Sequence, residues 1–117
     1  MRRDDELLRG LLVRIEDHDD WIYEHQLDSG SSDAHVTEYY HLQLLADAGL
    51  LRETGKYGGD FRMTSQGHDF LAAIKNDTNW NKVKSVAGKT AISGVAAMVQ
   101  VATELVQQQI KAAMGIA

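Results

Sequence analysis

The chain has 117 residues, which is the size of one domain with a short appendage. Its formal net charge of -5 excludes an overall basic field that would attract nucleic acid or an anionic membrane. It contains no cysteine, which excludes disulfides, thiolate zinc sites and thiol nucleophiles and fits the reducing, cytoplasmic location that we expect. The residues that follow Met1 are charged, so we also expect no secretory signal.

The N-terminal stretch predicts an amphipathic helix that ends near Asp17. Asp4 or Asp5 can cap its first turn. Apolar residues recur at helical spacing, namely Leu7, Leu8, Leu11, Leu12 and Ile15. An acidic run with one histidine follows at residues 16–20, but it lacks the glycine turn and the terminal glutamate of a calcium loop. We therefore interpret this run as a solvated helix end and predict no metal site.

Residues 21–27 alternate weakly between apolar and polar positions, which predicts a short strand that joins a sheet formed further along the chain. Residues 28–33 are typical of a loop, and Ser32 or Asp33 can cap the helix that follows. We expect the two tryptophans, Trp21 and Trp80, to anchor the core or an interface rather than to stack on nucleic-acid bases.

A helix is predicted over residues 34–48, and Gly49 can end it in the left-handed conformation. The side expected to face the core comprises Tyr40, His41, Leu44, Leu45 and Ala48. Two short strands follow, joined by a turn at residues 57–60. Thr64 or Ser65 then caps a further helix with its own apolar stripe.

A helix followed by a two-stranded hairpin and another helix is typical of the recognition helix and wing of a winged helix-turn-helix. The predicted fold is therefore mainly α with a small β wing (α+β). We expect a winged helix-turn-helix-like domain at residues 1–79 and a C-terminal helical segment at residues 80–117.

The longest periodic segment runs from Thr90 to Met114 and predicts a long amphipathic helix. One face carries Ile92, Val95, Val99, Ala102, Val106 and Ile110. At about 1.5 Å per residue this helix extends roughly 35 Å, whereas a domain of the preceding residues has a radius of gyration of about 12 Å. We expect another copy of the chain to cover the remainder, giving a homo-oligomer with a dimer as the first expectation. The alternative is a helix that folds back across its own domain.

The same segment is not expected to cross a membrane. Lys89, Glu104 and Lys111 bracket an apolar stretch that is shorter than the roughly 20 residues that a bilayer requires. The polar face also lacks the lysine and arginine array of a membrane-surface helix, so we predict no membrane partner.

Several short motifs are similar to those of a bacterial and prophage family, domain of unknown function 2513, over residues 4–82. They are Tyr40-His41-Leu42, Ala48-Gly49-Leu50, the run from Met63 to Leu71, and Trp80-Asn81-Lys82. Met63 stands where the family usually has leucine, and Ser65 where an aromatic residue is common. The resemblance implies a winged-helix-like fold and a bacterial or phage setting, and it implies no activity, cofactor or partner.

The predicted recognition helix is acidic and partly apolar on the side that we expect to be exposed. That side comprises Glu38, Tyr39, Leu42, Gln43 and Asp47. No lysine or arginine occurs between Arg14 and Arg52, and phosphate contacts from these residues dominate the affinity for DNA. We therefore predict protein binding through this helix. The alternative is a DNA-binding regulator that uses the basic wing residues Arg52, Lys56 and Arg62.

No group of residues has the pattern of a catalytic site. The five histidines and many carboxylates form no nucleophile triad, phosphate-binding loop or zinc spacing. We expect His41 to pack in the core with a hydrogen-bonded nitrogen, and His68 to serve a helix start. The sequence predicts a non-enzymatic regulator with no catalytic, cofactor or metal residues.

Overall fold

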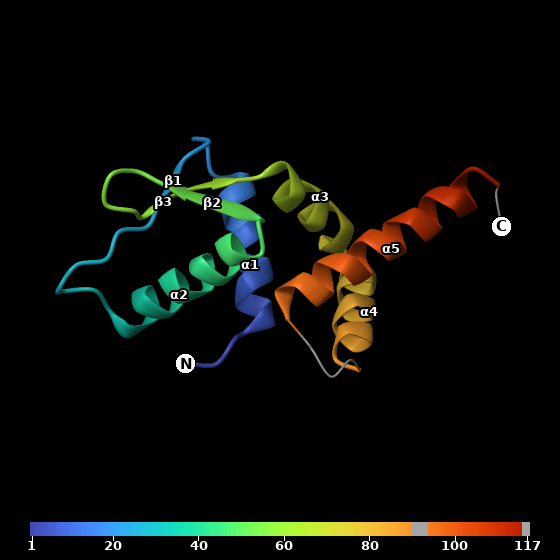
Figure 1. Cartoon of the computed structure of the whole chain (residues 1–117), viewed down its shortest axis with the longest axis horizontal. Helices are drawn as coiled ribbons and strands as arrows, with labels where there is room; N and C mark the ends of the chain where they lie inside the picture. Colours follow the sequence, from blue (N-terminus) through green and yellow to red (C-terminus); the bar gives the residue numbers. More distant parts are fainter. Residues whose placement is uncertain (90–93, 116–117) are drawn as a thin grey trace. The chain divides into compact units, whose positions relative to one another are not determined.

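The computed structural model describes residues 1–89 and 94–115. These residues form five helices and a three-stranded antiparallel sheet, which confirms the predicted α+β class (Figure 1). In chain order the elements are α1 (Asp5–Asp17), β1 (Tyr23–Glu24), α2 (Asp33–Asp47), β2 (Leu51–Thr54), β3 (Asp60–Met63), α3 (Ser65–Ile74), α4 (Asp77–Ala87) and α5 (Val95–Ala113). The chain divides into two compact units, Met1–His68 and Asp69–Ala117.

Both long helices of the first unit begin at the predicted type of cap. The Asp4 carboxylate accepts a hydrogen bond from the Leu7 amide, and the Ser32 hydroxyl accepts one from the His35 amide. α1 and α2 pack against each other, α1 also contacts β3, and α2 contacts β2 (Figure 1). Of the five residues predicted for the apolar stripe of α1, four are buried and Leu7 is half-buried.

The sheet has the strand order β1-β3-β2. Tyr23 pairs with Phe61, so the predicted short strand does join the later hairpin. The expectation that the tryptophans anchor the core or an interface is confirmed for Trp80, which is 2% exposed in the core, whereas Trp21 is 73% exposed and is not a core residue. Trp21 lies before β1 in a bend, where no strand partner covers it.

The predicted cap of α3 is Thr64, and it also ties this helix to the hairpin. Its hydroxyl donates to the Gly49 carbonyl at 2.6 Å and accepts from the Gly67 amide at 3.0 Å. Its amide donates to the Leu50 carbonyl. Gly49 itself has a φ of 80°, so the glycine after α2 takes the left-handed conformation that was predicted.

The second unit is built around the packing of α4 and α5. Asn76 caps α4, and the Asn79 side chain donates to the Ala73 carbonyl and accepts from Gln109 on α5. Asn79 and Trp80 are both buried in this unit, which begins at Asp69.

The apolar stripe of α5 is used mainly inside the same chain. Val95 and Ala102 are buried and Val99 is half-buried, because this part of the helix packs against α4. Val95 and Ala102 are therefore covered within the chain, and assigning them to a contact with another copy was wrong. Val106 is half-buried, whereas Ile110 is 52% exposed in the last turns, which extend past α4 (Figure 1). The predicted helix start at Thr90, and with it Ile92, lies outside the described residues.

Candidate functional site

The five residues predicted for the exposed side of α2 do not share a solvent-facing surface. Leu42 is completely buried, so its predicted exposure is wrong. Glu38, Tyr39 and Gln43 are partly covered and bond to other elements of the first unit, and Asp47 is the exposed member of the set. Relative to the expectation, α2 is turned about its axis by roughly one residue, about 100°.

Apolar side chains occur on all sides of α2, so periodicity alone does not select its inward face. The choice is made by long-range contacts. His41 is buried, its Nδ1 donates to the Thr37 carbonyl at 2.8 Å, and its Nε2 accepts from the Asp4 amide at 2.8 Å. The predicted core role of His41 is thus confirmed. Tyr40, predicted to face inward, is 37% exposed.

Glu53 on β2 is the residue that binds α2 to the hairpin. Its carboxylate accepts hydrogen bonds from the Tyr39 hydroxyl, the Gln43 amide and the Gly59 backbone amide at 2.8–2.9 Å. Burial by itself raises the pKa of Glu53, but the hydrogen bonds from Gln43, Gly59 and Tyr39 outweigh burial and lower it below its ordinary value. Glu53 therefore faces α2, on the side of the hairpin opposite to Arg52 and Arg62.

A second polar cluster joins α1, α2 and the segment after β1. Glu38 accepts a hydrogen bond from Arg14 at 2.8 Å, and its Oε2 lies 3.5 Å from Nε2 of His25. Burial raises the pKa of Glu38, and the hydrogen bond and charge of Arg14 outweigh it, so the net shift is downward. The Glu38 carboxylate therefore links α2 to α1 through Arg14, and it is not available to a binding partner in the way that its predicted exposure implied.

His25 and His35 stack face to face, with ring centroids 3.8 Å apart and planes within 9°. Nε2 of His35 donates to the Gln26 carbonyl, whereas both ring nitrogens of the buried His25 lack a hydrogen bond within the described part of the chain. Burial lowers the pKa of His25, and the charge of His35 lowers it further against the opposing effect of Glu38. The sequence offered no sign of this pair, because the two residues come from different elements.

The true outward face of α2 is formed by one helical stripe. It consists of the exposed Asp33, Val36, Tyr40 and Asp47, with the half-buried Leu44 between them. Val36 and Tyr40 are 39% and 37% exposed. An aromatic and two aliphatic side chains thus lie between two carboxylates, and α2 contains no lysine or arginine.

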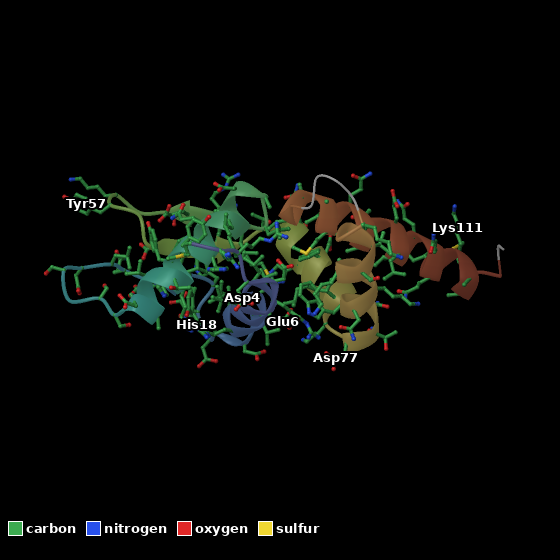
Figure 2. All side chains as sticks on the ribbon, turned by 90° about the horizontal axis from the view of Figure 1, so that it is seen from below. Asp4, Glu6, His18, Tyr57, Asp77 and Lys111 are labelled. Carbon is green, nitrogen blue, oxygen red and sulfur yellow. The ribbon has the colours of Figure 1, made fainter. Side chains whose placement is uncertain are left out.

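The predicted basic residues lie on the outer side of the hairpin. Arg52 pairs directly with Arg62 across β2 and β3, and Lys56 lies at the tip with its ammonium 5.6 Å from the Tyr57 ring centroid. Tyr57 is 89% exposed, and Figure 2 shows it pointing away from the rest of the hairpin. Asp60, which accepts a hydrogen bond from Gln26, still places a carboxylate on this hairpin.

A pocket of about 310 Å³ opens beside the hairpin within the first unit. Ile15 and Met63 contribute its buried apolar lining, and Trp21 and Arg62 are among its walls. The acidic run after α1 lines the same pocket. Sequence reasoning missed this site, although a tryptophan directly after an acidic run was a usable signal.

The described residues hold no cluster of three or more metal-ligating side chains. Over the same residues, the structure has no helix with both the length and the apolar character that a membrane span needs.

These features define a small, mainly helical α+β protein. The chain matches the family described as "Hypothetical protein (DUF2513)" over residues 2–93. It is also 30% identical over 118 residues to an "Uncharacterized protein" of Haemophilus influenzae, across 94% of this chain and 99% of that protein. No solved structure matches the chain. The chain belongs to the DUF2513 family, which confirms the resemblance drawn from its motifs.

Proposed function

We propose that the protein is a non-enzymatic binding module of the winged-helix type, which acts by contacting another protein through the outward face of α2. The element order supports the winged-helix assignment: a helix and a short strand precede α2, and the β2–β3 hairpin follows it as a wing. The strand β1 occupies the place of the usual first helix of a helix-turn-helix.

One observation carries the choice of partner. The exposed stripe of the helix that would enter a DNA groove presents Val36, Tyr40 and Leu44 between Asp33 and Asp47. Carboxylates on that helix would repel phosphates, whereas an aromatic anchor among aliphatic side chains suits a protein interface. The two flanking carboxylates favour a partner whose contact surface is apolar with a basic rim.

Affinity capture from a nuclease-treated lysate of the bacterial host tests this proposal with two matched variants. Tyr40→Ser removes the α2 anchor, and Tyr57→Ser makes the same change at the exposed hairpin tip. We expect Tyr40→Ser to lose proteins that the wild type and Tyr57→Ser retain. Equal retention by all three proteins would show that the α2 face is not the binding surface.

DNA binding through the hairpin is the second candidate, and the register of the sheet favours it. Directly opposed arginines repel each other and destabilise a sheet, so Arg52 and Arg62 suit an anionic ligand. The three carboxylates that share a pocket with Arg62 weigh against it.

Binding to random duplex DNA at low salt separates the two candidates. If the hairpin binds DNA, the affinity falls steeply with salt and is lost in Arg52→Gln/Arg62→Gln, while the control Lys111→Gln on α5 binds normally. No binding at low salt removes the DNA candidate.

Self-association through the end of α5 is a further part of the proposal. The last turns of α5 support it, because Ile110 and Met114 are 52% and 68% exposed there. A second copy is the proposed occupant, because exposed apolar side chains on one helix end can pair with themselves about a two-fold axis.

A further inference from the structure

The pocket beside the hairpin combines three features that point to one kind of ligand. Its apolar lining includes Ile15 and Met63, which are 6% and 9% exposed. Its wall carries Trp21, whose indole is 73% exposed although a hollow large enough for a side chain adjoins it. An exposed indole beside an apolar hollow offers a flat, electron-rich face to a ligand.

The charges of the pocket are unequal. Asp19 and Asp20 line it, against the single guanidinium of Arg62. No salt bridge joins Arg62 to either aspartate among the residues that the structure describes. The pocket also lies at the C-terminal end of α1, where the carbonyl groups of the last turn carry partial negative charge. The field in the pocket therefore favours a cation.

We infer that this pocket binds the guanidinium or ammonium group of an arginine or lysine side chain in a basic segment of a partner protein. The cation stacks on Trp21, its charge faces Asp19 and Asp20, and its aliphatic stem covers Ile15 and Met63. That the ligand belongs to a protein rests on the proposed function. The pocket itself is separate from the exposed stripe of α2, because no residue of α2 lines it.

The two tryptophans provide a readout with an internal control. In a ¹H–¹⁵N spectrum, the exposed Trp21 and the buried Trp80 each contribute an indole N–H signal. The probe is a capped Gly-Arg-Gly peptide at constant ionic strength. The comparison peptides carry citrulline, which is neutral and nearly isosteric, or glutamate in place of arginine.

We expect the arginine peptide to shift the Trp21 signal saturably in the millimolar range while the Trp80 signal stays in place. Asp19→Asn/Asp20→Asn should weaken this binding about fivefold or more, since each exposed ion pair contributes modestly. The charge-matched control Glu24→Gln/Glu104→Gln, which changes two exposed carboxylates outside the pocket, should bind as the wild type does.

The inference is overturned by no shift with the arginine peptide, by an equal shift with citrulline, or by unchanged affinity in the Asp19/Asp20 variant. A shift with the glutamate peptide instead would assign the pocket to anions through Arg62, and would overturn it too. The proposed function fails separately, because partner capture depends on Tyr40. Loss of peptide binding with Tyr40-dependent capture intact would reject the pocket alone.

Discussion

The close packing around Gly67 explains why the motif that begins at Thr64 needs a glycine at this position. A Cβ at this position would overlap the Leu50 carbonyl oxygen and would lie 2.7 Å from Cγ of Met63. The Thr64 hydrogen bonds hold the start of α3 against the end of α2 at this point. The close approach is a packing requirement, because Gly67 does not need a positive φ.

Gly67→Ala should therefore lower the free energy of unfolding by about 1–3 kcal/mol, the usual cost of overpacking. This loss should exceed the gain in helix propensity, which is at most about 1 kcal/mol. The control is Gly10→Ala in α1, where no atom lies within 4 Å of the added Cβ; it should gain about 0.5–1 kcal/mol. Urea unfolding measures both, and a Gly67→Ala protein as stable as the wild type would contradict the packing argument.

Acid should destabilise the first unit through His25 before it acts through the carboxylates. Burial in the folded state lowers the pKa of His25 from its ordinary value of 6.5. Its contribution to the free energy of unfolding is therefore fully present above pH 6.5 and is lost as the pH falls below this value. Glu38 and Glu53 have pKa values below 4.5, so their contribution is present above pH 4.5 and is lost as the pH falls through their folded pKa values.

Urea unfolding at several pH values between 8 and 5 isolates the histidine. The groups that face His25 are His35, Glu38, Tyr23 and Tyr39, with Arg14 bound to Glu38. His25→Phe keeps an aromatic ring in the stack but cannot take up a proton. The free energy of unfolding of His25→Phe should fall less than that of the wild type between pH 8 and 5. If the two proteins lose the same free energy over this range, His25 is not the cause.

At the scale of elements, α2 and the hairpin are held together by one carboxylate. Glu53→Gln keeps the shape of the side chain but replaces an acceptor oxygen by a donor that faces the donors of Tyr39, Gln43 and Gly59. We expect a loss of about 1–3 kcal/mol in the free energy of unfolding. Glu24→Gln on β1, an exposed carboxylate, should change stability by less than about 0.5 kcal/mol. Equal effects of the two variants would show that Glu53 does not hold this junction.

The elements themselves were largely predictable. The caps at Asp4, Ser32 and Thr64, and the glycine after α2, are local signals that survive folding because they satisfy backbone groups within a few residues. The strand β1 was also predicted, since alternation is visible in a short window. The candidate site was less predictable: four of the five residues chosen on α2 face other parts of the first unit or its core.

At the scale of the whole molecule, the proposed pairing of two copies through the end of α5 sets the mass in solution. The wild type should have the mass of a dimer in light scattering at high protein concentration. Ile110→Asp should shift it to the monomer, because it places a charge in the apolar contact. Gln108→Asp, which is exposed on the same helix but on another side from Ile110 and Met114, is the matched control. A wild-type monomer at all concentrations would refute the pairing.

The sequence by itself determined the α+β class, the order and approximate bounds of the elements, their caps and the family. These features depend on residues close together in the chain. Only the tertiary structure decided which side of α2 faces inward, that Glu53 binds α2, that His25 stacks on His35, and that α5 packs on α4. The apolar side chains of α2 occur on all of its sides. Its orientation therefore follows from contacts with α1 and the hairpin, which no local periodicity encodes.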